Sequence, residues 1–415
     1  MDSAAAALHS RYDLVRQRTV RLSAPLSSED AQVQSMPDAS PAKWHLAHTT
    51  WFFETFVLAV LGERAFDPTF TYLFNSYYET VGAHVDRARR GLVSRPTLAQ
   101  VHAYREDIDA RLCNALVEDR LDSQLLRILE LGLHHEQQHQ ELMLTDAKHL
   151  LGTQPFHPAY RNDLASSDRA TVAPAGWLDF AGGIVEIGAA NGFAFDSERP
   201  RHRVVLPPFR LASRPVCNAE VLAFIGDHGY AEPRFWLSDG FAIARAEGWR
   251  APLYWEQGDG QWLQYQLGGL RELDPAETAC HLSFYEADAI ARWAGARLPA
   301  EAEWEHAAQN VAVAGHFSDD DRLHPTAATG DGLRQLFGDV WEWTQSAFGP
   351  YPGFRPLAGA LGEYNGKFMS SQMVLRGGSC LTPGGHVRAS YRNFFAPATR
   401  WQMSGVRFAT DGGQA

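Results

Sequence analysis

The sequence predicts an α+β protein with a helical N-terminal domain followed by a domain of short strands and short helices. The N-terminal part is dominated by helix-forming segments. Between Gly152 and Gly176, Pro, Ser, Asp and Gly break the helical pattern. After Gly176 the strands become short and the turns frequent, with many Gly and Trp residues. We therefore expect a helical domain over 1–160, a linker over 161–175 and a second domain over 176–415.

The composition excludes several classes of function. The 415 residues carry a formal net charge of -12, so no broad basic surface is available for nucleic acid. We find no secretory signal pattern, and the apolar runs are too short to span a bilayer. The four cysteines are widely spaced and form no Cys-x-x-Cys motif. We expect a cytoplasmic enzyme with no nucleic-acid or membrane partner.

Four helices are expected in the N-terminal domain. The first covers residues 5–23, and the second follows Ser40, an N-cap before Pro41, and runs to Leu61. The third covers residues 98–116, and the fourth begins near Asp122. Four helices with moderate connections predict a four-helix bundle, whose facing side chains are a usual place for a metal.

The fourth helix carries two histidines on its apolar face. Residues 134–151 contain no Pro or Gly. One face of this helix is formed by Ile128, Leu131, His135, His139, Leu142, Asp146 and His149. Buried imidazoles need partners. Either His135 and His139 are core residues satisfied by hydrogen bonds, or the two rings, one helical turn apart, hold one divalent metal.

The second helix supplies a third candidate ligand. His48 shares a face with Trp44 and Trp51, whereas His45 lies to one side of that face. We expect His48 to point inward, with His45 as the alternative. One histidine of this helix, together with His135 and His139, would form a three-histidine site with open coordination positions.

A long loop, 67–97, separates the second and third expected helices. Its aromatic content argues against disorder, and a loop of this length inside a bundle is usually functional. Tyr77 and Tyr78 are either packing residues or phenols directed at the metal. Arg87 and Arg90 are either solvated charges or a clamp for a substrate carboxylate.

Several motifs together resemble the ergothioneine-biosynthesis sulfoxide synthases. The N-terminal motifs are 45–54, 73–79 and 135–142, and the C-terminal ones are 297–304, 338–344, 376–379, 388–393 and 405–408. The resemblance covers nearly the whole chain. It implies a DinB-like four-helix bundle followed by a formylglycine-generating-enzyme-like domain of C-type-lectin type.

The resemblance also implies a reaction and its cofactor. It implies a non-haem iron(II) site, Fe(2+), and an O₂-dependent bond between the imidazole ring carbon of hercynine and the sulfur of a thiol. The ligands that it implies are His48, His135 and His139. His134 stands where the family pattern leads us to expect Gln, but it lies about 100° from His135 on the helix, so we keep His135.

Further residues are assigned by the same resemblance. Gln138 matches a residue that contacts hercynine, and Arg87 and Arg90 match the spacing of arginines that hold the thiol. Trp401 lies in a segment that resembles the part closing over the active site. The Tyr pair resembles the branch of the family that uses a Tyr as proton donor, so Tyr77 and Tyr78 are the candidates.

The second substrate is left open by the sequence. The segment 368–372, which contains Ser371 and Gln372, differs from the pattern of many relatives. A related group, the selenoneine synthases, joins hercynine to the selenium of a selenosugar on the same iron scaffold. A sugar donor needs no arginine clamp for a carboxylate. The sequence does not decide between a sulfoxide product and a selenoether.

Three other functions are considered. His135-Glu136-x-x-His139 is the zincin signature, which would make Glu136 the general base of a zinc peptidase, but a suitably spaced third ligand is absent downstream. Formylglycine generation, by resemblance to enzymes of that type, would use copper bound by two cysteines. Cys380 has no second cysteine near it in sequence, which argues against this function. A sugar-binding lectin module is supported by fold analogy alone.

Overall fold

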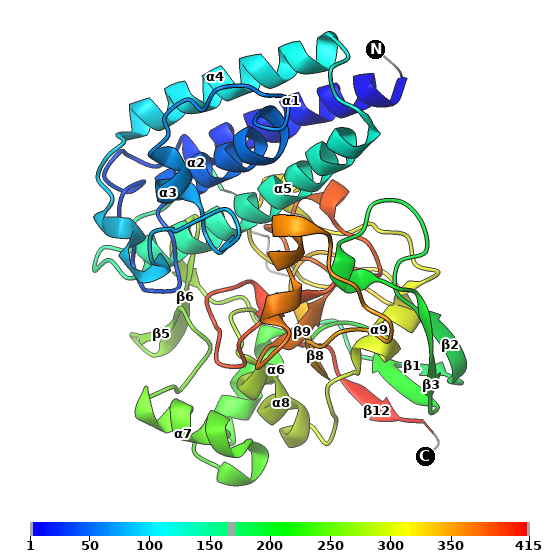
Figure 1. The fold of residues 1–415 in the computed structure, drawn as a ribbon. Helices are drawn as coiled ribbons and strands as arrows, with labels where there is room; N and C mark the ends of the chain where they lie inside the picture. Colours follow the sequence, from blue (N-terminus) through cyan, green and yellow to red (C-terminus); the bar gives the residue numbers. More distant parts are fainter. Residues whose placement is uncertain (1–2, 165–170, 413–415) are drawn as a thin grey trace. The chain divides into compact units, whose positions relative to one another are not determined.

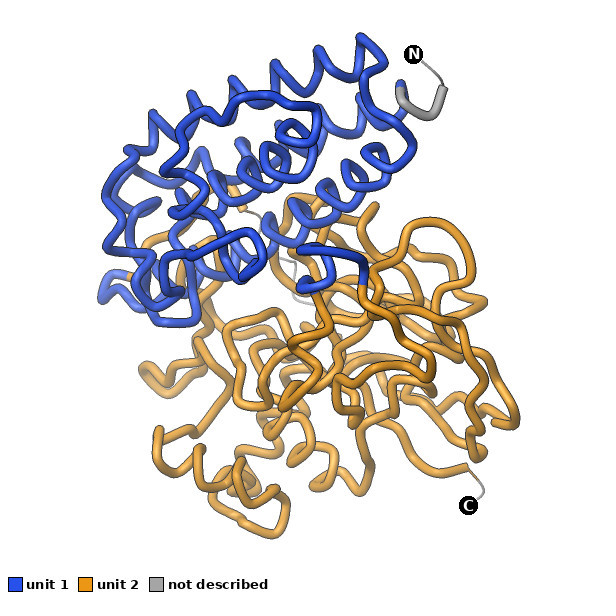
Figure 2. Tube along the Cα trace, viewed as in Figure 1, with its two compact units in different colours: residues 1–156, 357–364 blue, residues 157–356, 365–415 orange. Residues whose placement is uncertain are grey.

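The computed structural model describes residues 3–164 and 171–412, which form two compact units. Unit 1 contains residues 1–156 and 357–364, and unit 2 contains residues 157–356 and 365–415 (Figure 2). Residues 165–170 of the expected linker lie outside the described residues. Helices and sheets are both present, which confirms the α+β class. No helix in the described residues is both long and apolar enough to cross a membrane.

Unit 1 contains the four expected helices. They are α1 (Ser3–Ser23), α2 (Ala42–Phe53), α4 (Leu98–Val117) and α5 (Ser123–Gly152), with a short α3 (Phe70–Phe74) between α2 and α4 (Figure 1). Helix α2 packs against both α4 and α5, and α1 packs against α5. Asp122 caps α5 through its carboxylate, which accepts from the backbone N–H groups of Gln124 and Leu125.

The second helix does not continue as an α-helix to Leu61. After Phe53 it becomes a π-helix over Glu54–Leu58, in which the N–H of Ala59 donates to the carbonyl of Glu54 at 2.8 Å. The carboxylate of Glu54 accepts from the Tyr104 hydroxyl of α4. The apolar pattern of a sequence does not distinguish a π-helix, whose hydrogen bonds join residues five apart, from an α-helix, whose hydrogen bonds join residues four apart.

A buried polar network joins the four long helices. The Glu136 carboxylate of α5 accepts from Arg16 of α1 and from Arg105 of α4, each at 2.8 Å. Both guanidinium groups also donate to the Thr50 hydroxyl of α2, at 3.0 Å from Arg16 and 3.2 Å from Arg105. Burial alone would raise the pKa of Glu136, but Arg16 and Arg105 hold it at about 2.

A glycine allows α5 to approach α2 closely. A Cβ atom on Gly132 would lie 2.5 Å from a ring carbon of Phe53 and 2.9 Å from one of Phe52. Real side chains do not tolerate such distances, so a larger residue here would force the two rings or the helices to shift. The close approach brings α5 against the helix that carries His48.

Residues 357–364 belong to unit 1 although they are remote from it in sequence. The Glu363 carboxylate accepts from the backbone N–H groups of Glu79 and Thr80, each at 3.0 Å. These bonds fix the segment against the loop that contains Tyr77 and Tyr78.

The described residues of unit 2 form four small sheets. Their strand orders are β1-β4-β12, β10-β9-β8-β11, β2-β3 and β5-β6-β7. The strands are β1 (Trp177–Phe180), β2 (Gly183–Ile187), β3 (His202–Leu206), β4 (Phe209–Ala212), β5 (Trp255–Gly258), β6 (Gln261–Gln266), β7 (Gly269–Glu272), β8 (Trp341–Ala347), β9 (Met373–Arg376), β10 (Asn393–Phe395), β11 (Ser404–Gly405) and β12 (Ala409–Asp411). The helices are α6 (Asn218–Gly226), α7 (Ser238–Ala246), α8 (Phe284–Trp293) and α9 (Glu301–Ala308).

Tryptophans and buried ion pairs hold unit 2 together. Trp341 and Trp343 of β8 are buried, and Glu342 between them accepts from Arg407 at 2.7 Å and from the Trp304 indole at 2.7 Å. These contacts give the aromatic motifs of the C-terminal half a structural role.

Replacing Glu136 by Gln is expected to destabilise the protein by about 3 kcal/mol, because two buried guanidinium groups lose their counter-charge. The folded pKa of Glu136, about 2, lies below its usual value of 4.5. Its stabilisation is therefore complete above pH 4.5 and is lost as the pH falls towards 2. Urea unfolding of E136Q and wild type at several pH values measures both effects.

Glu130 is the matched control on the same helix. Its pair with Arg11 is half-exposed at 3.5 Å, so E130Q should change the unfolding free energy by less than about 1 kcal/mol. Equal losses in the two variants would contradict the role given to the buried network.

Candidate metal centre

His48 of α2 and His135 and His139 of α5 come together in unit 1. One ring nitrogen from each lies within 4.8 Å of the other two. The ring centroids are 4.9 Å apart for His48 and His135, 4.8 Å for His48 and His139, and 4.6 Å for His135 and His139. The apolar face of α5 and the inward face of α2 therefore bring these three rings together, as the sequence predicts.

The nitrogens of this cluster have the properties that a metal site requires. Nδ1 of His48 lies 2.6 Å from the carbonyl of Phe74, which can only accept, so Nδ1 carries the hydrogen and Nε2 the lone pair. His48 Nε2 and both ring nitrogens of His135 are buried without a hydrogen-bond partner among the described residues. Burial lowers the pKa of His135 to about 3 and those of His48 and His139 well below the usual value. Neutral imidazoles with unpaired nitrogens fit a divalent metal.

The ring of His48 is held between two indoles. Trp44 stacks on one side with centroids 4.5 Å apart, and Trp51 stacks on the other at 5.5 Å. The guanidinium carbon of Arg90 lies 3.5 Å from the ring centroid of Trp44. This column fixes the direction of the His48 lone pair.

The two alternative histidines have other partners. His45 does not join the three-histidine cluster, and its Nδ1 lies 2.8 Å from Nδ1 of His139. His134 bonds to the Arg11 guanidinium through Nε2 at 2.8 Å. The structure therefore places both beside the cluster rather than in it.

Gln138 lies next to a tyrosine that the sequence did not single out. The Tyr364 hydroxyl donates to Oε1 of Gln138. The Tyr364 ring lies 5.6 Å from that of His135 and 6.5 Å from that of Tyr77. Tyr364 follows Gln138 by more than 200 residues, so no helical or strand spacing in the sequence could have linked them.

The two tyrosines of the loop differ in environment. Tyr78 is buried against Trp51 and Phe56, and burial raises its pKa well above the usual value. Tyr77 is half-buried, and its ring lies 4.7 Å from that of Tyr78. With Tyr364 they form an aromatic wall beside Gln138.

Arg87 and Arg90 lie in different environments. Arg90 is buried, donates to the Ser40 hydroxyl at 2.9 Å and stacks on Trp44. Arg87 is exposed and donates to the backbone carbonyl of Asp38. Both members of the expected clamp thus bond to groups of the protein itself, Arg90 in a buried position and Arg87 in an exposed one.

Three expected site residues belong to unit 2. Trp401 and Gln372 are half-buried, and Ser371 is exposed with a positive φ of 57°. The carbonyl of Gln372 accepts from the N–H of Phe348 at 2.9 Å. These three residues therefore lie in unit 2, whereas the histidine cluster lies in unit 1.

The glutamate of the zincin signature does not face the cluster. Glu136 has an exposed fraction of 0% and is bonded to Arg16, Arg105 and the Thr19 hydroxyl. A general base must reach a substrate water. Because this network holds the Glu136 carboxylate, the residue cannot act as the general base that a zinc peptidase would need.

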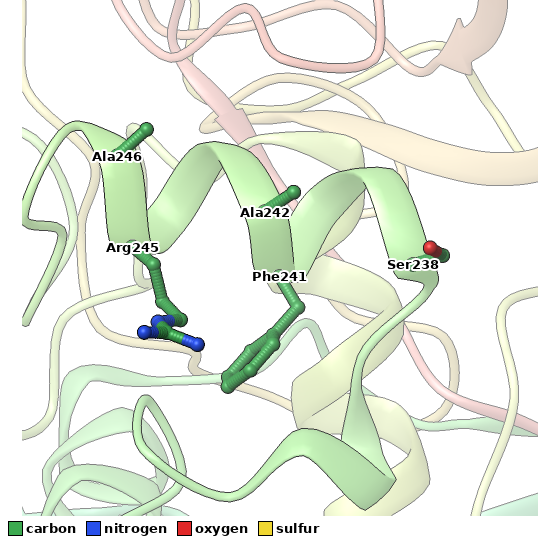
Figure 3. A pocket seen from close by; sticks show the side chains of 5 residues that line it. All are labelled: Ser238, Phe241, Ala242, Arg245 and Ala246. Carbon is green, nitrogen blue, oxygen red and sulfur yellow. The ribbon is translucent and has the colours of Figure 1, made fainter.

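A shallow pocket in unit 2 lies along one side of α7 (Figure 3). It is lined by Ser238, Phe241, Ala242, Arg245 and Ala246. These residues include no histidine, cysteine or carboxylate. The pocket therefore offers no metal chemistry, unlike the histidine cluster of unit 1.

Comparisons with known proteins agree with this arrangement. The DinB superfamily model matches residues 11–143, and the sulfatase-modifying factor enzyme 1-like domain model matches residues 165–412. The chain is 33% identical to the hercynine oxygenase of Mycolicibacterium smegmatis, over 96% of this chain and 97% of that one. This chain belongs to the hercynine oxygenase family.

Other relatives support that membership. The hercynine oxygenase of Mycobacterium tuberculosis is 32% identical over 95% of this chain and 96% of its own length. A formylglycine-generating enzyme of Streptomyces coelicolor is 29% identical, but the match covers only 57% of this chain and 89% of that enzyme. The family resemblance expected from the motifs is confirmed across both units.

His135→Ala is expected to abolish divalent-metal binding, because the remaining two imidazoles leave the cluster without a third ligand. Anaerobic titration with Fe(II), followed by measurement of retained metal, checks this. The matched control is His134→Ala, which removes the adjacent histidine bonded to Arg11 and should retain the metal. Retention by H135A, or equal loss in both variants, would contradict the ligand assignment.

Proposed function

We propose that this protein is an iron(II)- and O₂-dependent enzyme that joins the imidazole ring carbon of hercynine to the chalcogen atom of a second substrate. The observation that carries the proposal is the cluster of His48, His135 and His139, with unpaired nitrogens, in a chain of the hercynine oxygenase family. Three neutral nitrogen ligands suit iron(II) and leave coordination positions open for substrates. Iron, when bound, supplies the activation of O₂.

The protein side chains would bind and orient hercynine. Gln138 adjoins the ligand His139 in sequence, and its amide is held by Tyr364, so it can present an N–H group to the substrate. The aromatic wall of Tyr77, Tyr78 and Tyr364 suits a trimethylammonium group, which offers no hydrogen-bond donor but is attracted to ring faces.

Tyr364 is a stronger candidate for proton transfer than the loop tyrosines. Its ring is edge-on to the ligand His135, whereas Tyr78 contacts Trp51 and Phe56. A phenol beside the reacting atoms can deliver a proton during bond formation. Tyr77, which contacts both tyrosines, would support that position.

The second substrate is either a thiol, giving a carbon–sulfur bond, or a selenosugar, giving a carbon–selenium bond. The environment of Arg90 does not decide between them, because this guanidinium is stacked on Trp44 and bonded to Ser40, but its Nε has no partner among the described residues. A carboxylate-bearing thiol would need that group as part of a clamp. A neutral sugar donor would not.

The test is anaerobic loading with iron(II), then addition of hercynine and O₂ with cysteine, γ-glutamylcysteine or a selenosugar in parallel. Mass spectrometry should detect an adduct of hercynine with at least one donor, and none without O₂. H135A is the control for metal-independent chemistry. The absence of an adduct with every donor, from protein that retains iron, would overturn the proposal.

Tyr364→Phe is expected to lower the rate of product formation by about 10²-fold or more, the usual contribution of a positioned proton donor. Iron affinity should be unchanged, because the phenol is not a ligand. Tyr78→Phe is the matched control and should have the smaller effect. A wild-type rate in Y364F would exclude the proton-transfer role, and lost iron binding would show that the residue is structural instead.

A further inference from the structure

Two polar residues around the histidine cluster have no role in the proposed chemistry. His45 of α2 is buried beside the ligands, and Asp146 lies on the face of α5 that also carries His135 and His139. Their exposed fractions are 2% and 6%. Buried polar groups of this kind are retained where they form a satisfied network.

The two residues form a chain of contacts that ends on a ligand. Oδ2 of Asp146 lies 3.0 Å from Nε2 of His45, and Nδ1 of His45 lies 2.8 Å from Nδ1 of His139. The same Asp146 oxygen accepts from the backbone N–H of Ser40 at 2.8 Å, which anchors the carboxylate at the start of α2.

The positions of the hydrogens in this chain follow from the carboxylate. A carboxylate only accepts, so Nε2 of His45 carries the hydrogen that it donates to Asp146. In the neutral form of His45 the other ring nitrogen carries no hydrogen, so its Nδ1 accepts. Nδ1 of His139 therefore carries the donated hydrogen, and the lone pair of His139 is on Nε2.

We call these contacts the Asp146–His45–His139 relay. The relay accepts a hydrogen bond from Nδ1 of His139, just as the Phe74 carbonyl accepts one from Nδ1 of His48. In both ligands Nδ1 is engaged as a donor and Nε2 is left for the metal. The difference is that the acceptor behind His139 is connected to a negative charge. Such a connection increases the electron-donating power of the ligand.

We propose that His45 and Asp146 are positioning residues that fix the tautomer of His139 and strengthen it as a metal ligand. This inference rests on the proposed function, since it assigns a role toward the same metal. His45, the alternative ligand on α2, would then hydrogen-bond to a metal ligand instead of binding the metal itself. It also explains why an aspartate interrupts the apolar face of α5.

Metal affinity and ring tautomer are the two measurements that test the relay. Anaerobic titrations with Fe(II), and separately with Co(II), should show that His45→Phe binds about 10- to 100-fold more weakly than wild type. Phe preserves the ring but cannot accept a hydrogen bond. His45→Gln, whose amide oxygen can accept from Nδ1 of His139, should recover part of the affinity.

Asp146→Asn tests the charge with nearly unchanged shape. We expect weaker metal binding and a higher Fe(III)/Fe(II) midpoint potential, because the ligand loses its connection to a carboxylate. His149→Gln is the matched control, since His149 lies on the same face of α5 but bonds to the Ser35 hydroxyl. That variant should bind metal as wild type does.

Long-range ¹H–¹⁵N spectra of histidine-labelled apoprotein give a reading that needs no metal. The ring of His139, assigned by its loss in His139→Gln, should show hydrogen on Nδ1 in wild type and a mixed population in D146N. Hydrogen on Nε2 in wild type, or unchanged affinity in folded H45F and D146N, would overturn the relay. Failure of wild type to bind metal would overturn the proposed function instead, while the spectra still test the tautomer.

Discussion

The rotation of α5 about its own axis is the constraint on which the rest of unit 1 depends. Glu136 lies between Arg16 and Arg105, with both pairs buried. Because successive helical residues are about 100° apart, fixing Glu136 toward α1 and α4 turns His135 toward α2. A salt-bridged carboxylate thus sets the direction of the proposed metal ligands without touching them. Breaking such a buried pair is costly, which makes this orientation hard to change.

The histidine cluster is assembled from separate constraints on each ring. His48 is held in a stack of indoles and donates to the Phe74 carbonyl, while the proposed relay of His45 and Asp146 orients His139. The ring of His135 lies 4.8 Å from that of Phe52, a ring that Gly132 allows to pack closely against α5. Ligands that are pre-oriented in this way need little rearrangement on metal binding.

The sequence predicted those features that follow from local periodicity. The positions of α1, α4 and α5, and the pairing of His135 with His139, follow from the helical repeat. The Asp122 cap sets the start of α5 as expected. The expected Ser40 cap of α2 is wrong, because the N-cap is Pro41 with no side-chain cap, and the Ser40 hydroxyl accepts from Arg90 instead. The conversion of α2 into a π-helix at Glu54 was not predictable, because it depends on partners in other elements.

Features that depend on contacts between distant segments were missed. Tyr364 reaches Gln138 only because residues 357–364 join unit 1, and the composition of that segment gives no sign of this. The burial of Arg90 on Trp44 could not be predicted either, because a run of arginines is typical of solvated charges and Trp44 lies on another element. His45 was weighed as a ligand, but its true partners, Asp146 and His139, lie on another helix.

Iron K-edge X-ray absorption of the reconstituted protein tests the central claim most directly. The account predicts one iron per chain, with nitrogen or oxygen neighbours and the outer-shell scattering of imidazole rings that His48, His135 and His139 would produce. Iron that is not retained, or a first shell containing a protein thiolate in the absence of substrate, would contradict it.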